Sequence, residues 1–423
     1  MYENKACTER AILAAVDTGE YDVDLSLDEL AALAESAGAA VLARISQKRP
    51  QFDPATCMGE GRIEELAEAV KAYECNLVIF DHELSASQLR NIEQAVGAAV
   101  IDRTMLILDI FAQRAVTDEG KLQVELAQQR YLLPRLQGIG TQLSRLGGGI
   151  GTRGPGETKL EADRRHIRRR IGALEQRLKE LCARRERLRA RRKKDSVTTV
   201  AVVGYTNVGK STLLNALTGA DVLAENRLFA TLDLTSRALE LPDGRSVLLV
   251  DTVGLIRRLP HHLVEAFHST LEEAAAADLI LIVCDISSPD ADEQLEVTQK
   301  VLSELGADGI PVVIACNKCD VAGPLPFPLQ KNTMLISAKT GFGFDRLLSA
   351  IAEGLAPTQQ RMRLLIPYAK SALRQEITEA GKVLYEEYTE NGILLDALVD
   401  YKILYKFEGM TLPQQENEKR KEE

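Results

Sequence analysis

The sequence lacks any long apolar run. No stretch of about eighteen apolar residues, the length that a membrane-spanning helix requires, occurs among its 423 residues. The first ten residues also lack the apolar core of a signal peptide. We therefore expect neither secretion nor a transmembrane segment, and we predict a cytoplasmic protein. Weak peripheral association with a membrane is the one membrane contact left open.

The cysteine pattern does not indicate a disulfide framework. The seven cysteines are scattered, odd in number and in several cases set inside apolar runs, as reduced thiols of a reducing compartment are. Cys316 and Cys319 have CxxC spacing, but no second pair or nearby His accompanies them, so we expect no metal there. A composition of 45% apolar and 27% charged residues is ordinary for a soluble protein.

The net charge of −10 conceals a strong asymmetry. Residues 159–194 contain sixteen Lys or Arg and five Asp or Glu, so this segment carries +11 and the rest of the chain −21. One basic block in an acidic protein indicates a polyphosphate partner, nucleic acid first, because releasing counterions from phosphates supplies affinity. The alternative is a solvated helix face.

A strand, a glycine-rich loop and a helix follow one another near the middle of the chain. Residues 197–203 are apolar and β-branched, as in a buried strand, and residues 212–217 favour a helix. The loop between them has the phosphate-binding pattern GxxxxGK[ST]. With the first helical residue it comprises Gly204, Tyr205, Thr206, Asn207, Val208, Gly209, Lys210, Ser211 and Thr212. In this geometry backbone N–H groups surround the β- and γ-phosphates, Lys210 adds a charge, and Ser211 ligates Mg²⁺.

Four later segments complete a predicted GTP site. They are Phe229, Ala230, Thr231, Leu232 and Asp233; Asp251, Thr252, Val253 and Gly254; Asn317, Lys318, Cys319 and Asp320; and Ser337, Ala338 and Lys339. Asp320 would select guanine, because one carboxylate accepts hydrogen bonds from N1–H and the 2-amino group, a donor pair that adenine lacks. Asp251 would hold Mg²⁺ through water, Thr231 would close over it, and Gly254 would donate its N–H to the γ-phosphate.

These five segments in this order resemble the translation-factor class of GTPases on a Ras-like α/β fold. Ras-like enzymes follow the glycine with a glutamine that orients water, whereas this chain has Leu255, so we expect slow intrinsic hydrolysis. Arg257 and Arg258 could substitute, or could be surface charges or partner contacts. Asn207 matches the asparagine with which potassium-activated GTPases hold K⁺, so K⁺ is a candidate cofactor beside Mg²⁺. The predicted catalytic residues are Asn207, Lys210, Thr231 and Gly254, and the predicted metal ligands are Ser211, Thr231 and Asp251.

The fold class is α/β, in four predicted regions. They are an N-terminal α/β subdomain at 1–118, a basic helical hairpin at 119–195, a GTPase domain with a doubly wound sheet at 196–357, and a small α+β domain with a polar tail at 358–423. Leucines and isoleucines of the basic helix recur at spacings of four and three, which predicts a seam packed against an antiparallel helix. The hairpin tip, 138–156, holds eight glycines, and we favour a binding loop there over a flexible linker. In the last region, residues 362–367 favour a strand, 371–386 a helix and 392–405 extended structure.

Leu255, Asn207 and the run GGIGTRGPGETKLE at 148–161 resemble the HflX family of ribosome-associated GTPases. The resemblance covers almost the whole chain. It implies binding to the large ribosomal subunit, GTP hydrolysis stimulated by that subunit, and separation of stalled or idle ribosomes, often under heat or other stress. It also implies that the loop 138–158 reaches rRNA near the peptidyl-transferase centre while helix 159–194 contacts rRNA phosphates. The predicted rRNA-binding residues are Arg153, Lys159, Arg164, Arg165, Arg168, Arg169 and Arg170.

Other interpretations stay open. A GTPase switch could act in ribosome assembly, or on a protein or membrane partner outside the ribosome. A nucleic-acid-binding scaffold with a vestigial nucleotide site would show no turnover. The sequence also leaves open whether the N-terminal unit binds ATP and what the extension past about residue 405 does. We expect a monomer.

Overall fold

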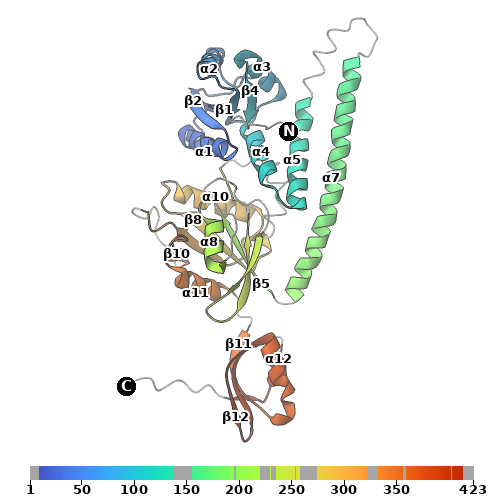
Figure 1. Cartoon of the computed structure of the whole chain (residues 1–423), viewed down its shortest axis with the longest axis vertical. Coiled ribbons are helices and arrows are strands. Elements are labelled where there is room, and N and C mark those ends of the chain that lie inside the picture. Colours follow the sequence, from blue (N-terminus) through green and yellow to red (C-terminus); the bar gives the residue numbers. More distant parts are fainter. Residues whose placement is uncertain are drawn as a thin grey trace, which may run out of the picture. The chain divides into compact units, whose positions relative to one another are not determined.

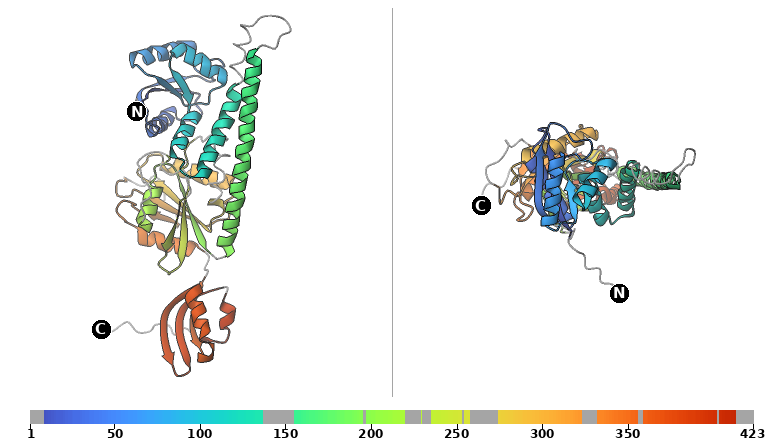
Figure 2. Two further views of the ribbon diagram at one scale, coloured as in Figure 1. Left: turned by 45° about the vertical axis from the view of Figure 1, so that its right-hand side comes forward. Right: turned by 90° about the horizontal axis from the view of Figure 1, so that it is seen from above.

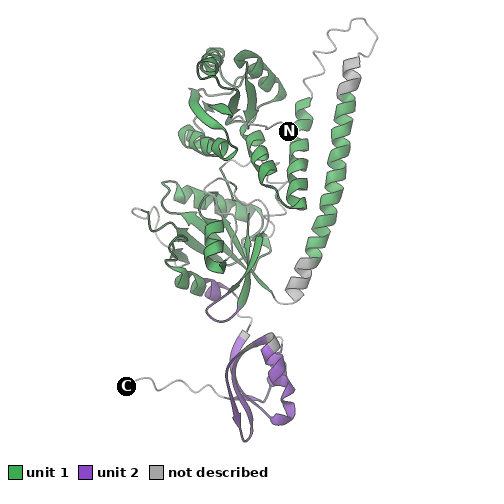
Figure 3. Cartoon of the chain, viewed as in Figure 1, with its two compact units in different colours: residues 1–239, 246–350 green, residues 240–245, 351–423 purple. Residues whose placement is uncertain are grey.

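The computed structural model describes residues 9–136, 155–194, 197–219, 229, 235–252, 254–257, 274–322, 332–355, 359–401 and 403–412. The chain forms two compact units (Figure 3). The first contains residues 1–239 and 246–350, and the second contains residues 240–245 and 351–423. Among the helices of the described ranges, none is long and apolar enough to cross a membrane.

The first unit begins with a four-stranded parallel sheet in the order β2-β1-β3-β4 (Figure 1). Its strands are β1 (Arg10–Asp17), β2 (Ala40–Lys48), β3 (Leu77–Phe80) and β4 (Ala99–Asp102). Its helices are α1 (Val23–Ser36), α2 (Glu60–Ala72), α3 (Ala86–Val96) and α4 (Arg103–Arg114). Six consecutive residues of β1 are fully buried, as expected for an inner strand of a parallel sheet whose two faces are covered.

Side chains fix where these helices begin. Asp22 and Asp102 accept hydrogen bonds from the first-turn N–H groups of α1 and α4. Ser85 forms a capping box with Gln88 at the start of α3. Each cap satisfies backbone donors that a helix start otherwise leaves unpaired. The helix starts therefore lie at fixed places beside the carboxyl ends of the strands.

Two antiparallel helices follow, α5 (Asp118–Arg135) and α7 (Pro155–Lys194). Glu119, at the start of α5, pairs with Arg185 in the second half of α7, whereas Glu125 and Arg130, farther along α5, pair with Arg170 and Glu175, which come earlier in α7. Figure 1 and Figure 2 show the two helices side by side. The predicted seam is confirmed from Ile167 to Leu181, where its positions are buried or half-buried between exposed neighbours. Residues 138–154 of the predicted glycine-rich tip lie outside the described residues, and residues 155 and 156, also predicted to belong to the tip, form the start of α7.

The predicted GTPase domain contains a six-stranded sheet in the order β10-β9-β8-β5-β7-β6. Its strands are β5 (Thr198–Gly204), β6 (Thr235–Glu240), β7 (Ser246–Asp251), β8 (Leu279–Asp285), β9 (Val312–Asn317) and β10 (Thr333–Leu335). The strands from β10 to β7 are parallel. Its helices are α8 (Lys210–Thr218), α10 (Ala291–Glu304) and α11 (Phe344–Gly354). This is the predicted doubly wound sheet, with the phosphate loop between β5 and α8.

The second unit contains an antiparallel sheet in the order β12-β13-β11-β14. Its elements are β11 (Gln359–Ile366), η2 (Tyr368–Lys370), α12 (Ala372–Ala380), β12 (Gly381–Thr389), β13 (Gly392–Asp400), η3 (Leu404–Phe407) and β14 (Thr411–Leu412). The predicted helix over 371–386 is wrong in its second half, because the helix ends at Ala380 and a strand begins. A side chain at Gly381 would lie 2.1 Å from the Leu398 carbonyl oxygen, so the strand starts where only glycine fits.

Candidate nucleotide site and basic hairpin

Glycines let the phosphate loop approach neighbouring segments closely. A Cβ atom built on Gly204 would lie 2.2 Å from the Val283 carbonyl oxygen, and one on Gly209 would lie 2.3 Å from Nδ2 of Asn317. Both glycines also have positive φ, 157° and 97°. Asn207 lies between them at φ 61°, a left-handed conformation that asparagine tolerates better than most residues. The two glycines of the pattern GxxxxGK[ST] are therefore required for two reasons: neighbouring atoms leave no room for a Cβ, and the backbone has positive φ.

Lys210 is a buried cation inside this loop. Its Nζ donates hydrogen bonds to the carbonyl oxygens of Gly204 at 3.0 Å and Tyr205 at 2.7 Å. Burial lowers the pKa of Lys210 to about 8, and the Asp251 carboxylate offsets only part of that effect. An anion beside Nζ would favour the charged form. The loop is thus built to receive negative charge.

The predicted metal ligands Ser211 and Asp251 lie together. The Ser211 hydroxyl donates to Oδ2 of Asp251 at 3.2 Å, and Asp251 is completely buried at the end of β7. A hydroxyl and a carboxylate are hard oxygen ligands that suit Mg²⁺, which keeps waters and phosphates in its remaining positions. Within the described ranges no group of three or more His, Cys, Asp or Glu side chains could hold a metal. The Ser211 hydroxyl and the Asp251 carboxylate therefore make a donor set that suits Mg²⁺.

The segment after Asp251 pairs with the phosphate loop through its backbone. The N–H of Leu255 donates to the Gly204 carbonyl at 3.1 Å, and the N–H of Thr206 donates to the Leu255 carbonyl at 2.8 Å. Gly254 consequently lies against the loop, where a Cβ would be 2.7 Å from Cγ2 of Thr206 and 3.1 Å from Nζ of Lys210. Gly254 therefore lies beside the loop lysine.

Leu255 and Arg257 leave no obvious group to orient water. The Leu255 side chain, apolar by its sequence, is also buried. The Arg257 guanidinium pairs with Glu293 at 2.8 Å and Asp290 at 3.4 Å, at the start of α10. That pairing directs its charge to a neighbouring helix and favours the interpretation of Arg257 as a structural contact.

The predicted base-binding segments meet at Asn317. Its Nδ2 donates to the Val208 carbonyl at 2.8 Å, and its Oδ1 accepts the N–H of Ala338 at 2.8 Å. One amide side chain thus joins the phosphate loop to the two segments that would surround the base. Nearby, Nζ of Lys318 pairs with Asp285 at 2.5 Å, while Asp320 is exposed. Because the Asp320 carboxylate is exposed at this edge, it is accessible to a nucleotide base.

Seven predicted site residues are wholly or partly outside the described part of the chain. Ala230, Thr231, Leu232, Asp233, Val253 and Arg153 lie outside the described residues, as does the side chain of Lys159. Phe229 is described, buried and held at φ 56°. For Phe229 and the other described site residues, the predicted roles are supported by where the residues lie and what they contact. For the residues outside the described ranges, the predicted roles are supported by the sequence alone.

The sequence did not predict the contacts that helices α1 and α4 of the N-terminal part make with this site. The ring of Phe111 in α4 packs edge-on against Phe229 with 4.7 Å between centroids. The Tyr205 hydroxyl donates to the Glu29 carboxylate, and Arg103 donates to the Arg257 carbonyl at 3.2 Å. The only sequence signal was a tyrosine at the second position of the phosphate loop, and nothing in its spacing names a partner 176 residues earlier.

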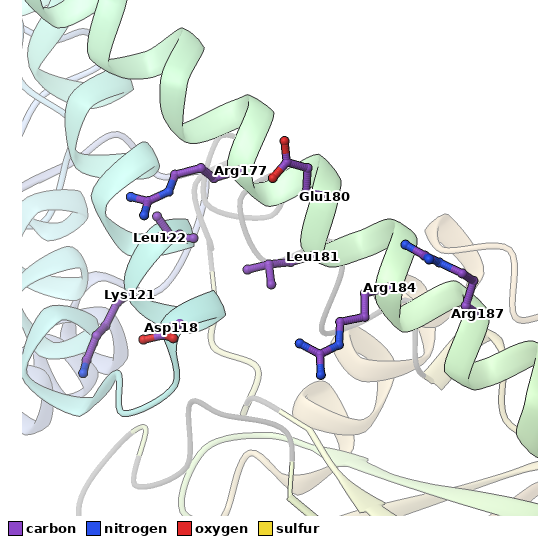
Figure 4. A pocket seen from close by; sticks show the side chains of 8 residues that line it. All are labelled: Asp118, Lys121, Leu122, Arg177, Glu180, Leu181, Arg184 and Arg187. Atoms are coloured by element: carbon purple, nitrogen blue, oxygen red, sulfur yellow. The ribbon is translucent and has the colours of Figure 1, made fainter.

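The basic hairpin presents cations to solvent and a groove between its helices. Arg165, Arg168 and Arg169 are exposed, whereas Arg170 pairs with Glu125 at 2.6 Å. The groove has a volume of about 530 Å³ (Figure 4). It is lined from α5 by Asp118, Lys121 and Leu122, and from α7 by Arg177, Glu180, Leu181, Arg184 and Arg187. Four cations against two carboxylates make it an anion-attracting surface.

Three family models match consecutive parts of the chain. The N-terminal model of GTP-binding GTPases matches residues 24–112, the model of their middle region matches residues 114–192, and the model of 50S ribosome-binding GTPases matches residues 199–318.

Two curated proteins are similar over most of their length. The GTPase HflX of Caldanaerobacter subterraneus subsp. tengcongensis is 53% identical over 395 residues, which is 93% of this chain and 92% of that protein. The GTPase HflX of Escherichia coli strain K12 is 43% identical over 399 residues, or 93% of each. Among solved structures, a GTP-binding protein of the archaeon Sulfolobus solfataricus in complex with GDP is 24% identical. The match covers 82% of this chain and 98% of that one, with a TM-score of 0.44.

Proposed function

Because this chain belongs to the HflX family of GTPases and is a GTP hydrolase, we propose that it binds the large ribosomal subunit and splits or recycles stalled or idle ribosomes, also under stress. The observation that carries the ribosomal part is the basic α5–α7 hairpin directly before the GTPase domain. The family description of residues 199–318 as a 50S ribosome-binding GTPase supports it.

GTP is bound by the phosphate loop and the segments gathered around it. Lys210 pairs with the β- and γ-phosphates, and Asn317 holds the base-binding segments against the loop. Gly254, beside Lys210, donates its N–H to the γ-phosphate, and Asp320 accepts hydrogen bonds from guanine. The other residues predicted to bind GTP, in the five segments that begin at Gly204, Phe229, Asp251, Asn317 and Ser337, surround the nucleotide in this proposal.

Two cations serve this site. Ser211, Asp251 and Thr231 hold Mg²⁺, which neutralises charge on the phosphates when bound. Asn207, exposed at the loop and in a left-handed conformation, holds K⁺ beside them. Faster GTP hydrolysis in KCl than in NaCl at equal ionic strength is the expected result, and equal rates would remove K⁺ from the proposal.

Hydrolysis depends on the ribosome because, among residues 255–257, which are the described residues directly after Gly254, none presents a free group to orient water. The buried Leu255 side chain neither donates nor accepts hydrogen bonds, and the Arg257 guanidinium is paired with α10. A partner that provides or repositions such a group would accelerate turnover by a large factor, as activating proteins do for other GTPases. The large subunit is the candidate activator.

The hairpin anchors the protein on rRNA. Arg164, Arg165, Arg168 and Arg169, together with Arg153, Lys159 and Arg170, contact phosphates, and the groove beside Arg177 and Arg184 adds a second cationic surface. Ion pairs between α5 and α7 keep this surface in one shape, since Arg170 and Arg185 each bind a carboxylate of α5.

The test compares GTP hydrolysis with and without purified large subunits, together with co-sedimentation. Arg164, Arg165, Arg168 and Arg169 are changed to Gln, leaving Arg170 in place because it pairs with Glu125. We expect subunit binding to weaken and its salt dependence to flatten, with unstimulated hydrolysis unchanged. The matched control neutralises four exposed cations elsewhere, Lys48, Lys71, Lys300 and Arg346.

Two outcomes would contradict the proposal. If large subunits leave the hydrolysis rate unchanged, the chain acts on another partner, and a switch in assembly or at a protein or membrane becomes the better interpretation. If the hairpin variant binds subunits as tightly as the control variant, the basic helix is not the anchor.

A further inference from the structure

Three segments of the nucleotide site are in contact with the N-terminal sheet and its helices. The phosphate loop contributes Tyr205, the next segment contributes Phe229, and the segment after Gly254 contributes Arg257. In GTPases the phosphate loop holds the phosphates, and the two later segments are those that contacts with the γ-phosphate order. The N-terminal part of the chain is therefore attached to the nucleotide-sensing segments rather than to a remote surface of the domain.

The Tyr205 hydroxyl joins two of these segments to α1. It donates a hydrogen bond to the Glu29 carboxylate and accepts one from the backbone N–H of Arg257. The Tyr205 side chain is buried, and burial together with the Glu29 charge raises the pKa of Tyr205, so the hydroxyl stays protonated as a donor. One atom thus links the phosphate loop, the N-terminal helix and the segment after Gly254.

Arg103 completes this contact from the other side. It is almost fully buried at the start of α4, pairs with Asp81 at 2.8 Å and with Glu29, and donates to the Arg257 carbonyl at 3.2 Å. Both backbone polar groups of Arg257 are therefore satisfied through Tyr205 and Arg103. We call Glu29, Asp81 and Arg103, with Tyr205 and Arg257, the N-terminal clamp.

The position of the clamp in the N-terminal sheet is where α/β proteins usually bind ligands. In the strand order β2-β1-β3-β4, the chain runs outward in both directions from β1 and β3, so the switch point lies between them. Asp81 follows the carboxyl end of β3, and Arg103 follows that of β4. Here this edge is occupied by side chains that hold the GTPase domain.

We propose that Glu29 and Arg103 are positioning residues for γ-phosphate recognition. Arg257 lies two residues past Leu255, whose backbone pairs with Gly204 and Thr206 and so places Gly254 beside Lys210. Holding both polar groups of Arg257 stabilises this arrangement. GTP has the γ-phosphate that Gly254 would contact and GDP does not, so the clamp strengthens GTP binding and leaves GDP binding nearly unchanged.

Linkage makes the effect reciprocal. If docking of the N-terminal part favours GTP over GDP, GTP must favour that docking by the same factor. The inference rests on the role proposed above for Gly254 and not on the ribosomal partner.

The test measures dissociation constants for a non-hydrolysable GTP analogue and for GDP on the full-length protein. Tyr205→Phe removes the hydroxyl, and Glu29→Gln removes the charge, with little change in volume. We expect each variant to bind the analogue about tenfold more weakly, relative to GDP, than the parent protein does, which is the size of one lost charge-assisted hydrogen bond. We also expect kcat for GTP hydrolysis to fall. Tyr205→Phe removes both hydrogen bonds of the hydroxyl, whereas Glu29→Gln keeps an acceptor for it but removes the charge that also pairs with Arg103. Because both changes act on the same hydroxyl, the loss in the double variant should be smaller than the sum of the two single losses.

Asp28→Asn is the matched control. Asp28 precedes Glu29 on α1, is exposed and pairs with the exposed Arg44. The Asp28→Asn protein should therefore have the same ratio of analogue affinity to GDP affinity as the parent protein. Arg103→Ala is avoided because it would leave Asp81 buried without its cation. An unchanged ratio in both variants, or an equal loss for the analogue and GDP, would overturn the proposal. Gly254→Ala should abolish the preference for the analogue, and failure of that variant alone would instead refute the role of Gly254.

Discussion

The two sheets of the first unit are each followed by a buried cation at the first residue of a helix. In the N-terminal sheet it is Arg103 at the start of α4, and in the GTPase sheet it is Lys210 at the start of α8. Both positions are unfavourable for a cation, because burial removes water and the helix start carries positive partial charge. Both therefore need a nearby anion.

The two sheets meet that need differently. Burial by itself lowers the pKa of Arg103, but Glu29 and Asp81 outweigh it and raise the pKa above its ordinary value. For Lys210 burial dominates, and Asp251 recovers only part of the loss. The N-terminal sheet thus carries its anions as side chains, whereas the GTPase sheet leaves room for a phosphate. A charge that its own protein does not neutralise marks a ligand site.

Replacing Lys210 should separate activity from stability. In Lys210→Met we expect GTP turnover to fall by at least about a hundredfold, because a preorganised charge on the phosphates is lost. The nucleotide-free protein should unfold at the same or a higher urea concentration, since a poorly compensated buried charge is removed. Steady-state hydrolysis and urea unfolding measure the two effects. A clear loss of stability would mean that Lys210 is as well compensated as Arg103.

Replacing Arg103 should give the opposite result. Arg103→Met leaves Asp81 fully buried without its cation, and breaking such a pair costs about 3–5 kcal/mol of unfolding free energy. Asp81→Asn in the same protein should restore much of the loss. Arg44→Met is the control, because its pair with Asp28 is exposed and worth at most about 1 kcal/mol. Equal stability of the two single variants would show that the buried pair is not a structural requirement.

Local patterns predicted the GTPase sheet well. A β-branched run, a glycine loop and polar residues at strand ends are short-range signals, and they located Lys210, Asp251 and Asn317 before the fold was known. The helix over 371–386 failed because Gly381 matters only through a carbonyl of β13 that crowds it.

The clamp was beyond local prediction for the same reason. Glu29 on α1 looks like an ordinary surface charge, and its partner Tyr205 is remote in sequence. The edge-on packing of Phe111 on Phe229 likewise joins segments with no shared pattern. Sequence periodicity reports which face of an element is buried, and it does not report which distant element covers that face.

The smallest expected effect is a pH dependence that only the GTPase cation should show. Between about 8 and the ordinary lysine value of 10.5, Lys210 is neutral in the nucleotide-free fold and protonated in the unfolded chain. The unfolded chain then binds more protons, so the Lys210 contribution makes stability rise with pH in that window. Phosphate binding needs the protonated form, so affinity for GDP should fall by up to about tenfold per pH unit above about 8.

Isothermal titration with GDP from pH 7 to 9.5, beside urea unfolding of the nucleotide-free protein, tests both slopes. Arg103 and Tyr205, whose pKa values are raised, stay protonated in the folded protein throughout this range. Burial also raises the pKa of Cys57, which by itself makes stability fall with pH, so the Lys210 contribution is read as the difference in slope between the parent protein and Lys210→Met. In Lys210→Met the remaining GDP affinity should lose this pH dependence. If affinity and stability instead change in the same direction with pH, another group governs the titration, and the contrast between the two cations would not hold.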